Sequence, residues 1–460
     1  MHGVVISGSP AGLIVAKQNR NLMNLPNLVS HPLQRLRSSE TGIRLSKALL
    51  WGSFATILGR GLPLVAMMLA ARSLGPVAFG KLTLLYSTAV ALEVFVSAGF
   101  SLTCTKFVAD LHRQDPLRTG RILDLADVIT TITAMLIGGF LVILAPWLAG
   151  DVLAAPDLTP ELYSSVVLVT ILAFSGVRQG TLIGFEAFRA VALTELVGGL
   201  AIFLCVPLGA IMYGVQGAFG GMMLGYGLRL VAQHLAVARE VLELGIPRQW
   251  DLPMDELSVL WRFSLPGMLN SLLWGPVMWC AMAIIAHQPN GHAEVGVFSA
   301  ANQWFSLLLF LPSVINQAAF PILTERFHAG ETRSAWKVFY GQVLVILGAL
   351  TPLVLAIAVL SRYIMGVYGA EYGEKWLILV VVAIAAWFAA PQGPMGNLLL
   401  AHAKPWSWFT ASLVWAGCLL FVVAILRDHG ALALAWGYVV AYAARGLYAL
   451  FHVYQLRTYA

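Results

Sequence analysis

Long apolar stretches alternate with short polar segments along the chain from residue 48 onwards. A helix that crosses the hydrocarbon core of a bilayer needs roughly 20 consecutive apolar residues, and each stretch is about that long. Glycine and proline stand at the joints, as in Gly75-Pro76, where they favour turns. The pattern predicts an all-α, polytopic membrane protein with about 12 transmembrane helices. We expect them at 48–70, 82–105, 123–148, 162–184, 191–212, 216–238, 260–286, 295–323, 337–360, 376–400, 405–426 and 431–455.

The composition supports this interpretation. Hydrophobic residues make up 59% of the 460 residues and charged residues 11%, with a mean hydropathy of +0.80. Soluble domains carry about 25% charged residues, so lipid must be the solvent for most of this chain. The four cysteines lie inside apolar stretches and lack the spacing of metal ligands or of a disulfide framework. We therefore expect no metal, no other cofactor and no catalytic residue.

The basic residues predict the orientation. Of the 28 Lys and Arg, twenty fall in segments on one side of the predicted membrane, five on the other side and three at membrane depth. Cytoplasmic loops carry the excess of Lys and Arg, so both termini are expected in the cytoplasm. This arrangement, rather than nucleic-acid binding, accounts for the net charge of +6. Residues 1–43 lack a compact apolar core and a cleavage site, so we expect a poorly ordered cytoplasmic tail and not a signal peptide.

Residue pairs recur at a near-constant offset, which indicates a duplicated six-helix unit. We expect an N-terminal bundle at 44–243, a cytoplasmic linker at 244–259 and a C-terminal bundle at 260–460. Because six is even, the bundles are parallel repeats around a central cleft. A proline inside a helix bends it, so Pro63 and Pro276 are either static kinks or hinges. The pairs are Pro63 with Pro276, Gln179-Gly180 with Gln392-Gly393, Gly217-Ala218 with Gly430-Ala431, and Phe79-Gly80 with Val295-Gly296.

Charged residues at membrane depth are costly, by about 2.5–3.5 kcal/mol at a helix centre on insertion scales, and should have partners. Arg60 and Glu93 fall near mid-depth on neighbouring predicted helices. They are a candidate ion pair that either couples transport to an ion or only fixes packing. Glu93 is the only carboxylate that we expect clearly at mid-depth.

Three further arginines and two amides are candidate cleft residues. Arg229 and Arg445 are 216 residues apart in the sixth helices of the two halves, and Arg178 lies toward the cytoplasmic end of the fourth. Guanidinium groups match phosphate oxygens in pairs, so Arg60, Arg178, Arg229 and Arg445 predict a diphosphate site; snorkelling to headgroups is the alternative. Asn270 and Gln303 suit sugar hydroxyls, or simply helix–helix hydrogen bonds.

Two enzymatic interpretations find little support. Residues 75–81 resemble the start of a phosphate-binding loop, but Leu82 stands where magnesium needs Ser or Thr. The longest predicted outer loop, 149–161, is too short to hold the chemistry of a membrane glycosyltransferase or ligase.

Four segments resemble motifs of polysaccharide transporters, in the same order and at similar spacing. They are Arg72-Ser-Leu-Gly-Pro-Val-Ala-Phe-Gly80, Ser97-Ala-Gly-Phe-Ser-Leu-Thr-Cys-Thr-Lys-Phe107, Val295-Gly-Val-Phe-Ser-Ala-Ala301 and Met365-Gly-Val-Tyr-Gly-Ala-Glu-Tyr372. The chain thus resembles the oligosaccharide-flippase branch, of the O-antigen repeat-unit type, in the multidrug/oligosaccharidyl-lipid/polysaccharide exporter superfamily.

The resemblance implies a V-shaped pair of six-helix bundles in the bacterial inner membrane. It also implies flipping of polyprenyl-diphosphate-linked repeat units for O-antigen, capsule or exopolysaccharide, with a polymerase and a chain-length regulator as partners. A cation-coupled multidrug exporter of the same superfamily is the main alternative. An accessory membrane subunit is another.

Overall fold

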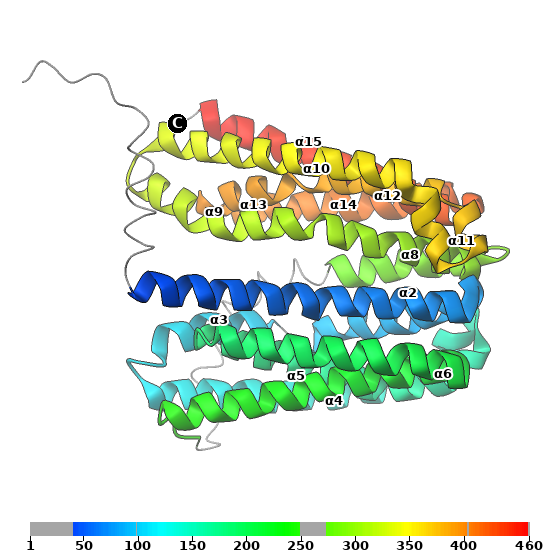
Figure 1. Ribbon diagram of the computed structural model, residues 1–460, viewed down its shortest axis with the longest axis horizontal. Helices are drawn as coiled ribbons and strands as arrows, with labels where there is room; N and C mark the ends of the chain where they lie inside the picture. Colours follow the sequence, from blue (N-terminus) through cyan, green and yellow to red (C-terminus); the bar gives the residue numbers. More distant parts are fainter. Residues whose placement is uncertain (1–39, 98, 249–272, 403, 459–460) are drawn as a thin grey trace, which may run out of the picture. The chain divides into compact units, whose positions relative to one another are not determined.

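The computed structural model describes residues 40–97, 99–248, 273–402 and 404–458, and for residues 40–58, 60, 321, 328, 405 and 458 it describes the backbone alone. The segment Gly52–Ala460 forms one compact unit, and the following account concerns that unit (Figure 1). Residues 1–39 of the predicted tail and 249–259 of the predicted linker lie outside the described residues.

The first half of the chain consists of five helices as counted along the backbone. They are α2 (Glu40–Ser97), α3 (Phe100–Leu111), α4 (Pro116–Trp147), α5 (Thr159–Gly184) and α6 (Phe188–Glu243). Two short turns, Leu148–Val152 and Pro156–Leu158, connect α4 to α5.

The second half begins, within the described residues, with the helix Leu273–Ala286. It continues with α8 (Gly291–Leu308), α9 (Phe310–His328), α10 (Thr332–Tyr368), α11 (Ala370–Glu374), α12 (Leu377–Ala389), α13 (Gln392–Ala401), α14 (Pro405–Ile425) and α15 (Ala431–Thr458).

The predicted membrane spans are present. Eight helical spans are long and apolar enough to cross a bilayer, and two of these contain a backbone break, at Gly75 in α2 and at Tyr213–Gly214 in α6. Each of these two helices therefore corresponds to two predicted spans. Leu273–Ala286 and α15 correspond to the predicted spans 260–286 and 431–455. The described residues form helices and no strand, which confirms the all-α polytopic fold.

Three predicted helices are divided where the sequence analysis expected continuous ones. The prediction 82–105 is interrupted between α2 and α3, where Gly99 has φ 73°, a value that glycine adopts without the steric cost of a Cβ. The prediction 295–323 is divided at Leu309, between α8 and α9. The prediction 376–400 is divided between α12 and α13, next to Pro391, because proline removes a helical hydrogen bond.

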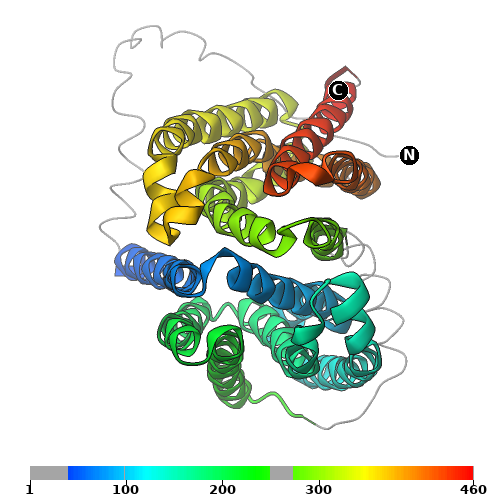
Figure 2. The same ribbon diagram turned by 90° about the vertical axis from the view of Figure 1, so that its right-hand side faces the viewer.

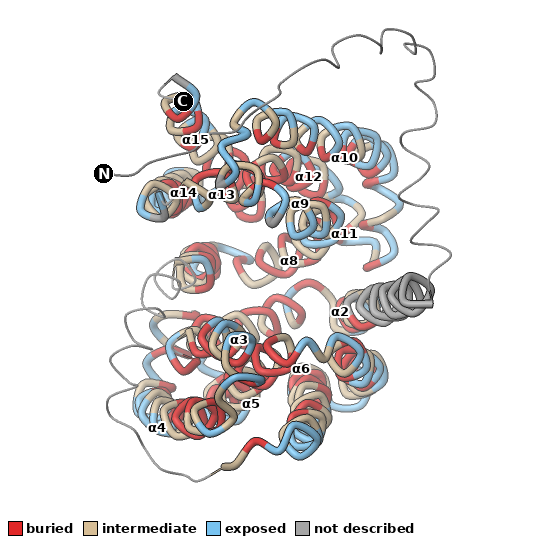
Figure 3. Tube along the Cα trace, turned by 90° about the vertical axis from the view of Figure 1, so that its left-hand side faces the viewer, coloured by how far each residue is buried: buried red, intermediate tan, exposed pale blue. Residues whose placement is uncertain are grey.

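Burial follows the expectation for a membrane protein. Figure 2 shows the helices packed side by side. The buried residues lie mostly toward neighbouring helices, and the exposed residues lie mostly on the outside (Figure 3). Many exposed residues are large and apolar, for example Met135 at 71% and Ile143 at 77% exposure on α4. Water disfavours such a surface, whereas hydrocarbon does not, so these faces are lipid-facing.

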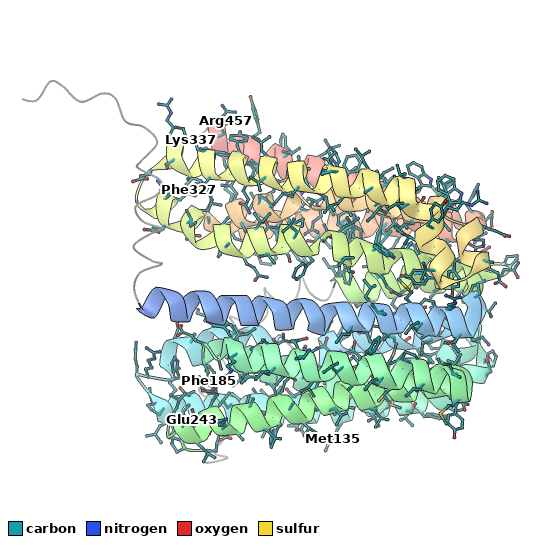
Figure 4. All side chains as sticks on the ribbon, in the orientation of Figure 1. Met135, Phe185, Glu243, Phe327, Lys337 and Arg457 are labelled. Atoms are coloured by element: carbon teal, nitrogen blue, oxygen red, sulfur yellow. The ribbon has the colours of Figure 1, made fainter. Side chains whose placement is uncertain are left out.

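The two halves touch closely at one end of the unit, at glycines that are equivalent in the repeat. A Cβ built on Gly80 would lie 1.8 Å from the carbonyl oxygen of His292, and one on Gly296 would lie 2.2 Å from the carbonyl oxygen of Pro76. We call this the glycine end. Phe185 and Glu243 lie at the opposite end of the helices, as do Phe327, Lys337 and Arg457 (Figure 4).

Two histidines join the halves near the glycine end. Nε2 of His287 donates a hydrogen bond of 2.8 Å to the carbonyl oxygen of Asp151, and Nε2 of His292 donates one of 2.9 Å to that of Leu153. Both acceptors lie on the segment that connects α4 to α5. The halves are therefore held together by main-chain contacts and by hydrogen bonds at the same end.

Candidate functional site

Arg445 is a half-buried arginine on α15 whose side chain reaches α14. Its Nη2 donates a hydrogen bond of 3.1 Å to Oγ of Ser412, and its Cζ lies 4.3 Å from the centre of the Trp408 ring. A guanidinium over an indole face gains about 0.5–2 kcal/mol. Among the described residues no carboxylate pairs with Arg445, and its Nε is buried without an acceptor. Its positive charge is therefore open to an anion.

Arg229, the near-equivalent of Arg445 in the first half, has a different environment. Its Nη2 lies 2.6 Å from Oε1 of Glu195 and donates a hydrogen bond of 2.9 Å to Oε1 of Gln179. Nε2 of Gln179 also donates to Oε1 of Glu195, at 3.1 Å. This network joins α5 and α6 inside the first half and neutralises the arginine there.

The repeat explains the difference between the two arginines. The residue 213 positions after Glu195 is Trp408, the same offset that relates Gln179 to Gln392. The acid that pairs with the first arginine is thus replaced by the indole on which Arg445 lies. Among the described residues, the second half therefore has an arginine at this place, Arg445, but no carboxylate that corresponds to Glu195.

Arg178 is also neutralised inside the first half. Its Nη2 lies 2.9 Å from Oδ1 of Asp127, and the two side chains are 7% and 9% exposed. The other oxygen of Asp127 accepts a hydrogen bond of 2.7 Å from Nη2 of Arg248, and Nε of Arg248 pairs with Asp124. The four residues form one buried network between α4, α5 and the segment after α6.

The same network anchors the start of the connection between the halves. A Cβ on Gly120 would lie 1.9 Å from the carbonyl oxygen of Pro247, so only glycine allows this segment to approach α4. Burial disfavours the charged form of Arg248, but its hydrogen bonds with Asp127 and Asp124 outweigh that effect and raise its pKa. The chain leaving the first half is therefore fixed by charge and by close packing.

Two predicted site residues cannot be placed. Asn270 lies outside the described residues, and so does the side chain of Arg60, so the predicted pair of Arg60 with Glu93 stays a prediction. Glu93 lies on α2 next to α5: its Oε1 is 3.6 Å from the Cβ position of Gly176. It also forms a hydrogen bond with Ser97.

Gln303 lies in a polar contact between α8 and α10. Its Oε1 accepts a hydrogen bond of 3.3 Å from the hydroxyl of Tyr368, whose oxygen in turn accepts one of 3.1 Å from Nε1 of Trp304. Gln303 thus forms a helix–helix hydrogen bond, and its contact with sugar hydroxyls stays a prediction.

The two prolines predicted as kinks or hinges lie inside helices. The non-helical backbone within α2 is at Gly75 and not at Pro63. Pro276 lies near the start of Leu273–Ala286 and lines a pocket between the halves. Their role as hinges stays a prediction.

Sequence reasoning missed three residues that determine these environments, namely Glu195, Asp127 and Trp408. Glu195 and Asp127 are buried carboxylates within predicted spans. The signal for both was available, since a buried arginine needs a partner. The repeat offset from Glu195 would have located Trp408.

The polysaccharide biosynthesis protein family matches residues 45–327 of this chain. The EPS I polysaccharide export inner membrane protein EpsE of Ralstonia solanacearum is 23% identical over 400 residues, which are 84% of this chain and 86% of that protein. The lipid III flippase of Escherichia coli K12 is 27% identical over 271 residues, which are 56% of this chain and 62% of that protein.

Solved structures share the fold. A multidrug resistance MATE family transporter in an inward-facing conformation superposes with a TM-score of 0.71 at 15% identity, covering 89% of this chain and 99% of that chain. The lipid II flippase MurJ, in an inward closed conformation, superposes with a TM-score of 0.72 at 12% identity, covering 88% and 87%.

The family match spans more than half of the sequence, and the relatives are named as export proteins and flippases. The chain therefore belongs to the polysaccharide biosynthesis protein family, and it is a multi-pass membrane transporter.

Proposed function

We propose that this protein moves a polyprenyl-diphosphate-linked oligosaccharide repeat unit from the cytoplasmic to the outer leaflet of the bacterial inner membrane. The unit serves O-antigen, capsule or exopolysaccharide synthesis, and the halves work by alternating access. The excess of Lys and Arg at one side supports cytoplasmic termini, which puts the glycine end at the outer surface. A polymerase and a chain-length regulator are the expected partners at that surface.

The observation that carries the proposal is the unbalanced charge of Arg445. Arg178 and Arg229 have carboxylate partners, whereas Arg445 has an indole and a hydroxyl. A buried cation without a counter-ion is unfavourable, and a diphosphate group supplies two negative centres. The guanidinium fork matches phosphate oxygens, so the lipid-linked head completes the site that the second half leaves open.

The experiment is complementation of a deletion strain with Arg445→Gln. Hydrogen bonds to charged groups contribute about 1.5–3 kcal/mol, so we expect surface polysaccharide to fall by roughly tenfold or more, with lipid-linked repeat unit accumulating inside. Arg362→Gln is the matched control, because Arg362 is an exposed arginine on α10. If the Arg445→Gln variant produced as much surface polysaccharide as wild type, Arg445 would have no role in substrate binding. Wild-type polysaccharide in the deletion strain itself would contradict the function.

The fold shared with a multidrug transporter keeps cation-coupled drug export as a second candidate. Glu93 is its candidate coupling group. Under this alternative the deletion strain becomes sensitive to cationic drugs, and Glu93→Gln abolishes resistance without changing surface polysaccharide. Unchanged drug sensitivity together with loss of surface polysaccharide in the deletion strain supports the oligosaccharide substrate.

A further inference from the structure

A pocket of about 660 Å³ lies between the two halves, in the half of the spans next to the glycine end. Residues of α2, α4 and Leu273–Ala286 line it, among them Thr88, Phe95, Phe140, Leu144, Trp279 and Cys280. The volume is within the range of small-molecule sites, about 300–1,000 Å³.

The pocket offers no free polar group to water. Its one hydroxyl, on Thr88, donates to the carbonyl oxygen of Leu84 at 2.8 Å and accepts from Nε1 of Trp279 at 2.8 Å. An apolar cavity does not hold water. Because all three lining helices are membrane-spanning or apolar, the pocket suits an apolar occupant such as a hydrocarbon chain.

The pocket is continuous with the contact between the halves. A Cβ on Gly275 would lie 3.4 Å from Cα of Ala91, and the Trp279–Thr88 hydrogen bond crosses the same junction. A chain in the pocket touches α2 and α4 of the first half and Leu273–Ala286 of the second. Its rim is open, since Phe95, Phe140 and Trp147 are 41%, 59% and 53% exposed.

We infer that this pocket binds the polyprenyl tail of the lipid-linked substrate. The inference rests on the proposed function and adds a second site to it, separate from Arg445. Four aromatic side chains line the pocket, and their faces suit the double bonds and methyl branches of an isoprenoid. A saturated, unbranched acyl chain of a phospholipid has neither feature. The tail therefore bridges the two halves while the diphosphate head is bound elsewhere.

Cys280 allows a direct test, because it lines the pocket and the chain has only three other cysteines. A variant with Cys104→Ser, Cys205→Ser and Cys418→Ser keeps Cys280 as the single thiol. In nanodiscs, we measure its alkylation by an apolar maleimide with added undecaprenyl diphosphate, which carries no sugar. At ten times its Kd the probe should slow alkylation roughly tenfold, and the same amount of added phosphatidylglycerol should not.

A filled pocket provides the second measurement. Leu144→Trp places an indole in the pocket, and Leu136→Trp on the same helix, 67% exposed and outside the pocket, is the matched control. In the single-cysteine protein, Leu144→Trp should abolish protection by undecaprenyl diphosphate, and Leu136→Trp should preserve it. Equal protection by both lipids, or none by either, overturns the tail site. Either result leaves the proposed function standing, because that function fails only if deletion leaves surface polysaccharide unchanged.

Discussion

Gly80 and Gly296 hold equivalent positions in the two halves of the sequence, and they also touch each other. A Cβ on Gly296 would lie 3.0 Å from the backbone nitrogen of Gly80. Equivalent residues that touch across a two-fold relation lie on or near its axis. The axis that relates the halves therefore passes through the glycine end, where the smallest side chain permits main chain to meet main chain.

We predict that Gly80→Ala weakens the contact between the halves. The added methyl would overlap the carbonyl oxygen of His292, and overpacking of this kind costs about 1–3 kcal/mol. Thermal unfolding of the purified protein should occur at lower temperature, and surface polysaccharide should fall. Gly139→Ala is the control, since nothing lies within 4 Å of a Cβ there. Equal stability of the two variants would contradict the close approach.

Arg229 and Glu195 should behave as a structural pair. Removing one partner of a buried ion pair costs about 3–5 kcal/mol, because the other charge stays buried. Arg229→Gln and Glu195→Gln should each lower the amount of protein in the membrane, and the double variant should recover much of it. A double-mutant cycle on thermal stability measures the coupling. Additive single effects would show that the pair contributes no coupling.

Trp408 should control the affinity of the Arg445 site. Trp408→Leu removes the ring beneath the guanidinium, and the loss of about 0.5–2 kcal/mol of cation–π attraction should reduce transport by roughly 2-fold to 30-fold. Trp408→Phe keeps an aromatic face and should retain more activity. Surface polysaccharide, normalised to protein amount, is the measurement. If leucine and phenylalanine perform equally, the ring is only a packing residue.

Arg248 should fix the start of the connection between the halves. Its loss removes a guanidinium that pairs with Asp124, whose side chain is 0% exposed. Arg248→Gln should therefore destabilise the first half by about 3–5 kcal/mol. Limited proteolysis at the segment after α6 should become faster than in wild type. Asp124→Asn combined with Arg248→Gln should restore resistance to proteolysis. If it does not, the destabilisation comes from the loss of another contact.

The sequence was sufficient for the number and class of the helices, because membrane spans need long apolar stretches and little else. It also located the chain break at Gly75-Pro76 and the equivalent glycines 80 and 296. It did not locate the division at Leu309, although Pro312 in the first turn of α9 is a signal for it, because a proline there has no N–H to donate to the carbonyl oxygen of Leu308.

The candidate site was less predictable. The predicted depth and the repeat symmetry identified Arg178, Arg229 and Arg445 as candidates. They gave no indication that the first two have carboxylate partners and the third does not. Whether an arginine is free depends on which acid approaches it from another helix. Asp127 approaches Arg178 from the preceding helix, and Glu195 approaches Arg229 across the backbone break of α6. Residue spacing along one continuous helix carries no information about either approach.

His287 and His292 donate to carbonyl oxygens of the main chain rather than to side chains. Every amino acid carries that acceptor, so positions 151 and 153 can vary between relatives without loss of the hydrogen bonds. The histidines themselves have no such freedom. Divergence in this segment should therefore be one-sided: the side chains of the loop after α4 can change while its attachment to the second half stays the same.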